Sequence, residues 1–303
     1  MTKNIMVNDT PEKKIYGLLG RNISYSLSPA MHNAAFKHFK INAEYTIFDR
    51  KEDELGVFFE KELLGWKISG INVTVPYKIK MKEMLEEGEG HTLDAQVRLF
   101  GALNTIKVDG RALSGFNTDA AGFYRSLSEV ISPRMELKGK DVLVIGAGGA
   151  GRVISLFLRY FSGVDPYPRV YVTDADEAKL HFNIPGVELD GIHPILPGQV
   201  EDKIKNCKLV VNATPLGTKE GDPAPIPLEW LRPGMVVYDL VYARKTELLA
   251  CAKRKGLKAV DGLGMLINQA ALAFAIWNPE APFGEIREVM TGALREKGLV
   301  PHR

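Results

Sequence analysis

The sequence predicts an α/β protein of two domains, and three observations support this fold class. The chain has 303 residues, a length typical of two domains. Short apolar runs typical of strands alternate with helical patterns in both halves, which favours mostly parallel sheets. The alternation breaks around residues 132–140, and hydrophobic residues make up 45% of the chain, so each half can bury a core of its own.

The N-terminal series begins with an apolar run that predicts a strand at residues 15–20. Ser28 and Pro29 resemble an N-cap followed by proline in the first helical turn, which predicts a helix from Pro29 to about Phe39. Further strands are expected at residues 43–49, 67–75, 102–108 and 112–117, and helices around residues 52–64 and 118–130.

The C-terminal series begins with a buried strand at residues 142–145 that runs directly into a glycine-rich turn. Two long helical patterns close the chain. The other expected strands lie at residues 169–174, 208–213, 235–241 and 258–262, and the expected helices include residues 246–256, 263–277 and 283–297.

The glycine-rich turn reads Gly-Ala-Gly-Gly-Ala-Gly at residues 146–151, between a strand and a helical pattern. Glycines at these positions let the backbone turn tightly and approach a pyrophosphate, whose charge the first amides of the helix stabilise. This context predicts a Rossmann nucleotide-binding domain rather than a plain link between strand and helix. Asp174 ends the next expected strand, where a carboxylate can accept hydrogen bonds from ribose hydroxyls.

Bulk properties argue against several other classes of protein. A formal net charge of +2, from 39 basic and 37 acidic residues, gives no electrostatic case for nucleic acid or an anionic membrane. The six histidines and two cysteines form no zinc-ligand spacing, and so few cysteines suggest a reducing compartment. The polar N-terminus has no signal core and the apolar stretch at residues 262–277 is too short to cross a bilayer, so we expect a cytoplasmic protein.

Eight short segments, taken in order, resemble the shikimate dehydrogenase family, which includes the quinate/shikimate dehydrogenases. The resemblance runs from about residue 15 to residue 278. The segments are SYSLSPAMHN (24–33), GINVTVPYK (70–78), GALNT (101–105), GFNTD (115–119), GAGGAGR (146–152), NATPLG (212–217), DLVY (239–242) and DGLGMLINQAALAF (261–274).

The resemblance implies an N-terminal substrate domain with a mostly parallel sheet and a C-terminal Rossmann domain, separated by a cleft. Residues 1–120 would form the first domain, with helices from about residue 265 to residue 303 packing back on it, and residues 121–264 the second. The implied activity is the reversible reduction of 3-dehydroshikimate to shikimate, a step of aromatic amino acid biosynthesis, with hydride from a nicotinamide nucleotide.

The same resemblance assigns roles to individual residues. Lys78 would donate or accept the proton, and Asp119 would hold the lysine charged and in position. The implied substrate-binding residues are Ser26, Ser28, Asn72, Thr74, Asn104, Tyr242 and Gln269. The implied cofactor-binding residues are Gly146, Ala147, Gly148, Gly149, Ala150, Arg152, Asp174, Thr214, Leu240, Gly262 and Met265.

The end of the second Rossmann strand departs from the pattern of the NADP-dependent members. They usually carry Asn-Arg-Thr where this chain has Asp174, Ala175 and Asp176. Carboxylates at this place would repel the 2′-phosphate of NADP and suit the ribose hydroxyls of NAD. We therefore expect NAD rather than NADP as the cofactor.

Three alternatives stay open. The substrate can be quinate, alone or together with shikimate, because Ser26 and Ser28 do not distinguish the two polyols. Another oxidoreductase of similar architecture, such as a methylenetetrahydrofolate dehydrogenase, would not need the paired serines. A non-catalytic sensor of the same fold would not need Lys78 and Asp119. We expect a small-molecule substrate, no nucleic-acid or membrane partner, and a monomer or homodimer.

Overall fold

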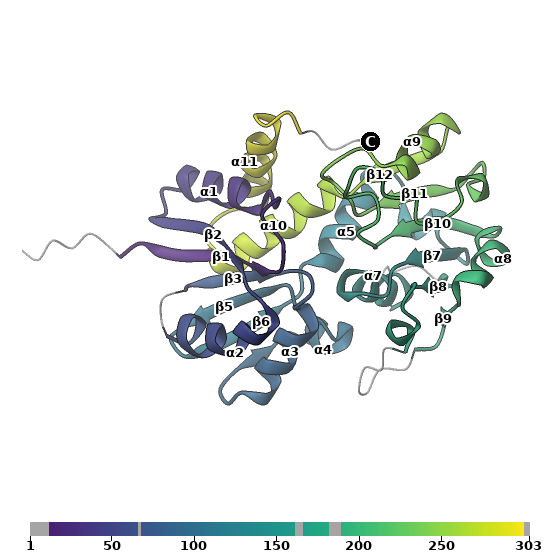
Figure 1. Cartoon of the computed structure of the whole chain (residues 1–303). Helices are drawn as coiled ribbons and strands as arrows, with labels where there is room; N and C mark the ends of the chain where they lie inside the picture. The colour runs from purple at the N-terminus through teal and green to yellow at the C-terminus, as the bar shows by residue number, and fades with distance from the viewer. Residues whose placement is uncertain (1–11, 66–67, 161–165, 182–188, 300–303) are drawn as a thin grey trace, which may run out of the picture.

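The computed structural model describes residues 12–65, 68–160, 166–181 and 189–299. They form two six-stranded sheets that stand next to each other, each flanked by helices (Figure 1). The first sheet contains, in spatial order, β2 (Ala43–Asp49), β1 (Lys14–Gly20), β3 (Gly70–Val73), β5 (Thr105–Asp109), β6 (Ala112–Phe116) and β4 (Thr92–Leu93).

The first sheet is mostly parallel, as predicted. β1 pairs in parallel with β2 and β3, and β4 with β6, whereas β5 is antiparallel to both of its neighbours. The antiparallel part arises because β5 and β6 form a hairpin in which Asp109 pairs with Ala112. Gly110 in the two-residue turn has φ of 60°, the left-handed conformation that such tight hairpins require.

The second sheet contains, in spatial order, β12 (Lys258–Asp261), β11 (Val236–Asp239), β10 (Cys207–Asn212), β7 (Asp141–Ile145), β8 (Arg169–Thr173) and β9 (Ile192–Pro194). All of these neighbours pair in parallel. If β7 is numbered as strand 1 of this domain, the spatial order read from β9 to β12 is 3-2-1-4-5-6. This order confirms the predicted Rossmann fold. The strand order reverses between the neighbours β7 and β10. The loops after these two strands therefore flank the position where such sheets bind ligands.

Helices flank both sheets. Their bounds are α1 (Ser28–His38), α2 (Leu55–Val57), α3 (Lys78–Glu87), α4 (Ala95–Phe100), α5 (Asp119–Ser128), α6 (Pro133–Glu136), α7 (Gly149–Tyr160), α8 (Val200–Ile204), α9 (Glu247–Arg254), α10 (Leu263–Trp277) and α11 (Phe283–Arg295). Short 3-10 helices lie at Glu52–Glu54, Glu177–Leu180, Pro197–Gln199 and Leu228–Trp230, and a π-helix at Phe58–Leu63.

Helix α10 joins the two halves of the molecule (Figure 1). It begins directly after β12, and its last residue, Trp277, donates a hydrogen bond of 3.1 Å from Nε1 to the Ile106 carbonyl of the first sheet. It crosses α5 so closely that a Cβ at Gly122 would lie 2.8 Å from the Gln269 Cβ. We propose domain boundaries near residues 120 and 264 on this arrangement, with α10 and α11 belonging to the first domain.

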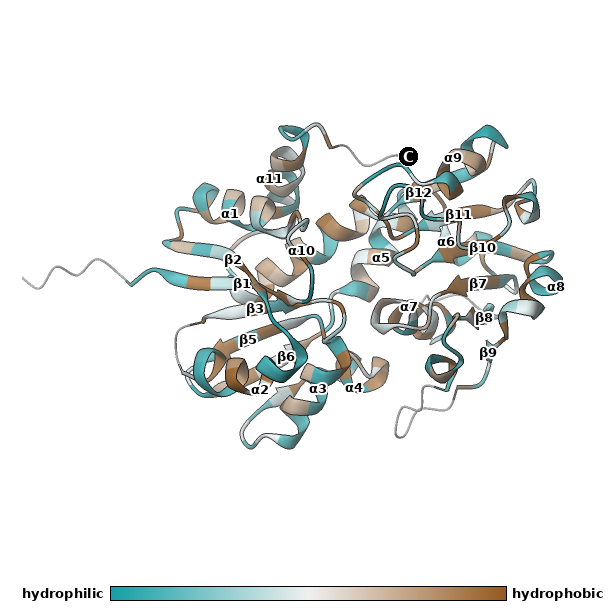
Figure 2. Cartoon of the chain, in the orientation of Figure 1, coloured by the Kyte–Doolittle hydropathy of each residue, from teal (hydrophilic) through white to brown (hydrophobic). Residues whose placement is uncertain are grey.

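The apolar residues of each half form cores on both faces of its sheet. Figure 2 shows apolar residues along the central strands of the second sheet and along α10, with hydrophilic residues spread over the outer helices. Val142, Leu143 and Val144 on β7 are fully buried, as expected for a central parallel strand covered on both faces. Among the described residues, no helix has the length and apolar content needed to span a membrane.

Three local predictions are corrected. Leu27, not Ser28, precedes the first turn of α1, and Ser28 is already helical without capping its own helix. Instead the backbone amide of Ser28 donates to the Ser26 hydroxyl at 3.2 Å. The region at residues 52–64 is a succession of short 3-10, α and π segments rather than one helix. The strand expected at residues 67–75 spans Gly70–Val73, and Lys67 lies outside the described residues.

His32 on α1 is a buried titratable group in the core of the first sheet. Its ring stacks on Tyr45 with centroids 4.2 Å apart and also lies near Phe274 and Trp277. Neither ring nitrogen has a hydrogen-bond partner among the described residues. Desolvation lowers the pKa of His32 from its ordinary 6.5 to about 3, so the folded protein keeps the ring neutral.

This burial predicts a specific weakness in acid. Because the unfolded chain binds a proton at His32 below pH 6.5 and the folded chain does not, the free energy of unfolding falls as the pH drops from 6.5 towards 3. The loss through this group approaches about 1.4 kcal/mol per pH unit. Replacing His32→Phe should therefore flatten the pH dependence of stability, measured by urea unfolding at pH 7, 5 and 4.

The matched control is His181→Phe, which replaces an exposed histidine. It should keep the wild-type slope. A wild-type slope in the His32→Phe variant would show that this ring is not the source of acid sensitivity.

Candidate active site

A cavity of about 330 Å³ lies between the two sheets and is lined by residues from both halves of the chain. Its size is typical of a site for a small ligand. Many residues predicted from the sequence meet there, namely Ser26, Ser28, Asn72, Thr74, Lys78, Asn104, Asp119, Ala150, Thr214, Leu240, Tyr242, Gly262, Met265 and Gln269. Six predicted residues do not line the cavity, namely Gly146, Ala147, Gly148, Gly149, Arg152 and Asp174.

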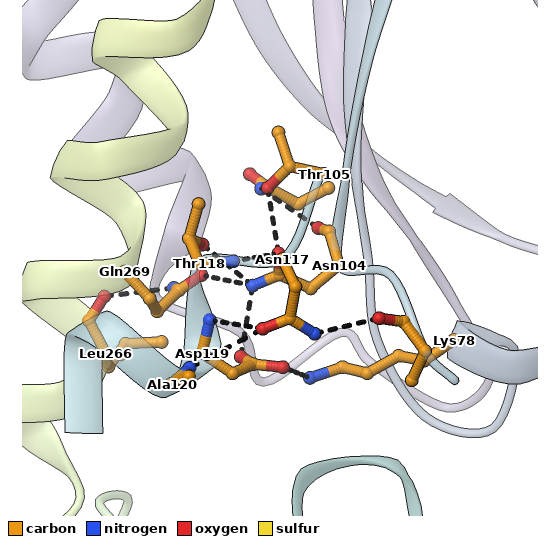
Figure 3. Close-up of polar contacts among 11 residues, drawn as sticks. Lys78, Asn104, Thr105, Asn117, Thr118, Asp119, Ala120, Leu266 and Gln269 are labelled. Carbon is orange, nitrogen blue, oxygen red and sulfur yellow. Dashed lines mark hydrogen bonds and ion pairs between the residues drawn. The ribbon is translucent and has the colours of Figure 1, made fainter. Parts of the chain in front are cut away.

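Lys78 and Asp119 form a buried ion pair at this cavity (Figure 3). Lys78 begins α3 and Asp119 begins α5, so the two helix starts present their side chains to the same place. The Lys78 Nζ lies 2.6 Å from the Asp119 Oδ2, and the two side chains are only 12% and 5% exposed. Exclusion of water strengthens their attraction, which fixes the ammonium group at the edge of the cavity.

Two asparagines hold Asp119, Asn117 at its backbone amide and Asn104 at its carboxylate (Figure 3). The Asn117 side chain accepts a hydrogen bond from the Asp119 amide at 3.1 Å and donates to the Ala102 carbonyl at 2.9 Å. The Asn104 Nδ2 donates to the Asp119 Oδ1 at 3.0 Å. The sequence analysis did not assign a role to Asn117, although an asparagine two residues before the first acid of a helix is a typical capping signal.

The amide group of Asn104 has more acceptors than hydrogens. Its Nδ2 lies 2.8 Å from the Thr118 hydroxyl, 3.0 Å from Asp119 and 3.3 Å from the Gln269 Oε1. An amide supplies two hydrogens, so the longest contact is the weakest. The Gln269 oxygen is therefore the group that a ligand hydroxyl can most easily recruit.

Asn72 supports this network from the first sheet. It accepts a hydrogen bond from the Tyr45 hydroxyl at 2.8 Å and donates to the Thr105 hydroxyl at 3.0 Å and the Asn104 carbonyl at 3.2 Å. Both of its amide hydrogens are thus used within the protein. Asn72 lines the cavity, but its donors position Asn104 and are not available to a ligand.

Several hydroxyl groups line the cavity, namely those of Ser26, Ser28 and Tyr242. The Ser26 and Ser28 oxygens lie 3.2 Å apart. Burial raises the pKa of Tyr242, so it stays a neutral donor at physiological pH. Tyr25, for which the motifs predict no role, also lines the cavity and is 53% exposed. Uncharged donors of this kind suit the carboxylate of a small ligand.

The glycine-rich turn has the shape that a pyrophosphate needs. Gly146 has φ of 104°, and a Cβ there would lie 2.8 Å from the Ala213 backbone, so only glycine fits. A Cβ at Gly148 would meet open space. Gly149 begins α7, where free backbone amides and the helix dipole favour an anion. These features fit a dinucleotide.

Gly149 also brings the turn against the ion pair. A Cβ on this residue would lie 3.3 Å from both the Cβ and the Cδ of Lys78. The lysine stem therefore packs on the first residue of α7. Lys78 of the first half and the glycine-rich turn of the second half are thus adjacent.

Asp174 does not face the cavity. Its Oδ2 accepts a hydrogen bond from the Ala147 amide at 2.8 Å, and its Oδ1 accepts one from the Asp176 amide at 2.9 Å. The Lys179 Nζ lies 4.0 Å away. The side chain is only 14% exposed. The carboxylate thus stabilises the glycine-rich turn through its hydrogen bond with the Ala147 amide.

The expectation of NAD as the cofactor is wrong. The chain is 34% identical over 295 residues to the shikimate dehydrogenase (NADP(+)) of Pelodictyon phaeoclathratiforme, and the match covers 95% of this chain and 100% of the relative. The expectation treated Asp174 as a free carboxylate facing the ribose. Both of its oxygens instead accept hydrogen bonds from backbone amides, so its presence at the strand end does not decide the nucleotide.

Family models and solved structures agree with this relative. Residues 18–106 match the shikimate dehydrogenase substrate binding domain, and residues 262–295 match the shikimate 5′-dehydrogenase C-terminal domain. The shikimate dehydrogenase structure from Aquifex aeolicus superposes with a TM-score of 0.78 at 33% identity, covering 96% of this chain and 100% of the other. The Thermus thermophilus enzyme in complex with NADP(H) and shikimate gives 0.73 at 31% identity, covering 92% and 99%. The chain belongs to the shikimate dehydrogenase family.

Proposed function

We propose that this protein reversibly reduces 3-dehydroshikimate to shikimate with NADPH. The observation that carries the proposal is the buried Lys78–Asp119 pair, which lies in a cavity between the two sheets and against the glycine-rich turn. The relatives that share the fold are named for this activity. The direct test is nucleotide absorbance of the purified protein with shikimate and NADP⁺, and with quinate as the second polyol. Absence of turnover with shikimate would refute the assignment.

The proposed chemistry divides between nucleotide and protein. When bound, the nicotinamide supplies the hydride that reduces the ring ketone. The protein must supply a proton to the oxygen that becomes the alcohol. The Lys78 ammonium is the charged donor at the cavity, and the hydrogen bond to Asp119 fixes its direction. In the oxidation direction the neutral lysine takes the proton back.

The substrate would lie in the cavity beside the ion pair. Ser26, Ser28 and Tyr242 are the donors for its carboxylate, because they are uncharged hydroxyls that line the cavity. Gln269 and Thr74 are the polar groups for the ring hydroxyls.

The nucleotide would lie on the second sheet. The turn at residues 146–150 and the first amides of α7 would hold the pyrophosphate. Leu240, Gly262 and Met265 line the cavity and provide an apolar wall for the nicotinamide. Lys179, whose side chain is 53% exposed beside the end of β8, is the cation we assign to the 2′-phosphate, together with Arg152 near the turn. A cytoplasmic location and a monomeric or homodimeric state stay predictions from the sequence.

Loss of Lys78 should lower turnover far more than it weakens the binding of shikimate. We predict that Lys78→Ala lowers kcat by at least about 100-fold, the usual scale for loss of a general acid, while the KM for shikimate changes less than about tenfold. Lys80→Ala is the matched control, because Lys80 lies on the same helix and is 52% exposed. It should keep wild-type kinetics. A Lys78→Ala enzyme with near-normal kcat would contradict the proton-donor role.

Loss of Lys179 should raise the KM for NADP⁺ but not the KM for NAD⁺. A cation about 4 Å from a phosphate is worth about 1 kcal/mol in water, which corresponds to about a fivefold change. We predict that Lys179→Ala raises the KM for NADP⁺ about fivefold and leaves the KM for NAD⁺ unchanged. Lys205→Ala, an exposed lysine after α8, is the control. An equal effect on both nucleotides would place the 2′-phosphate elsewhere.

A further inference from the structure

Asp239 is a fully buried carboxylate that the proposed chemistry does not use. It ends β11 and is 0% exposed. Among the described residues it forms no ion pair, since its partners are neutral donors. Its Oδ1 accepts hydrogen bonds from the Asn212 Nδ2 at 2.8 Å and the Val241 amide at 3.1 Å, and its Oδ2 accepts one from the Thr246 hydroxyl at 2.6 Å.

Burial of this group opposes stability. Desolvation raises the pKa of Asp239 to about 6, and the neighbouring Asp261, its register partner on β12, contributes to the rise. An anion in the core without a cation costs folding free energy, which well-packed apolar residues would not. Residues that break a packing rule in this way are expected where a site depends on them.

The three donors lead to different segments of the nucleotide side of the cavity. Val241 lines the cavity directly. The Asn212 Oδ1 accepts hydrogen bonds from the Thr214 amide at 3.0 Å and the Thr214 hydroxyl at 2.7 Å, and Thr214 also lines the cavity. Thr246 caps the start of α9 and packs on Gly217, where a Cβ would lie 2.8 Å from the Thr246 Cγ2.

The Thr214 hydroxyl is fully engaged in this network. It donates to Asn212 and accepts from the Leu216 amide at 3.2 Å, so its hydrogen is not available to a nucleotide. Its methyl group instead packs on the glycine-rich turn, since a Cβ at Gly146 would lie 3.0 Å from the Thr214 Cγ2. The position of this loop thus affects both the cavity wall and the turn.

We propose that Asp239 is a positioning residue of the nucleotide site, which holds Thr214 through Asn212 and holds Val241 directly, without touching the ligand. One carboxylate thereby sets the distance between the loop after β10 and the end of β11, two of the segments that line the nucleotide side of the cavity. The inference rests on the proposed function for the identity of the nucleotide only.

The test compares two replacements of this carboxylate. Asp239→Leu keeps the branched shape of the side chain but removes the acceptors of all three hydrogen bonds. Asp239→Asn keeps one oxygen for Asn212 and Val241, and its amide can donate to the Thr246 oxygen. NADPH binding is measured by nucleotide fluorescence, kcat and KM by absorbance, and stability by thermal unfolding. We expect Asp239→Leu to raise the Kd for NADPH at least about tenfold, and Asp239→Asn to change it less than about threefold.

The matched control is Asp141→Asn. Asp141 is also a buried carboxylate of this sheet, but it lies at the opposite end of the strands and pairs with Arg169 at 2.9 Å. This variant should lower the Tm and leave the Kd for NADPH unchanged. If it raises the Kd as much as Asp239→Leu does, the effect is general destabilisation and the positioning role is refuted.

A second pair of variants serves if Asp239→Leu does not fold. Thr246→Val removes one donor at constant volume and should raise the Kd for NADPH about threefold, whereas Thr246→Ser keeps the hydroxyl and should restore it. A wild-type Kd in folded Asp239→Leu or in Thr246→Val overturns the inference. A wild-type protein that binds NADPH but does not oxidise shikimate refutes the proposed function alone, and one that binds no NADPH refutes both proposals.

Discussion

The burial of one ion pair between two separate sheets is the constraint on which the site depends. Lys78 and Asp119 belong to the first half of the chain, yet the lysine stem packs on Gly149 of the second half. This contact requires that the two sheets be held at a fixed separation. The crossing of α5 and α10 provides it, because Gly122 lets the two helices approach until side chains touch backbone. The glycine at this crossing thus affects the position of Lys78 relative to the glycine-rich turn, although it does not touch either of them.

Polar side chains in the interior form a framework for the site. Asn72 and Asn104 use their amides to fix other side chains, Asn117 fixes the backbone at the start of α5, and Asp239 fixes Asn212 on the nucleotide side. Each of these groups is costly to bury unless its hydrogen bonds are made. Since the partners come from several elements, the networks form only when the elements are correctly placed. They therefore couple the fold to the geometry of the site.

The charge of Asp174 alone is weak evidence for the choice between NAD and NADP. Asp174 lies at the expected end of β8, where a carboxylate typically meets a ribose. Its oxygens instead accept hydrogen bonds from the Ala147 and Asp176 amides, and Lys179 stands nearby. A carboxylate whose oxygens already have donors repels an incoming phosphate less than a free one does. Relatives of this chain are named for NADP, in agreement with that arrangement.

The sequence alone determined the order of most strands and helices, the glycine-rich turn and many of the residues that line the cavity. The elements and the turn follow from apolar periodicity and the conformational demands of Gly146, and the cavity residues follow from the family resemblance that short motifs such as GFNTD carry. Only the tertiary structure decided what each polar side chain contacts. Asp174, Thr214 and Asp239 have their roles because of partners far along the chain or across a strand end, and which donor satisfies a buried oxygen is a property of the packed molecule.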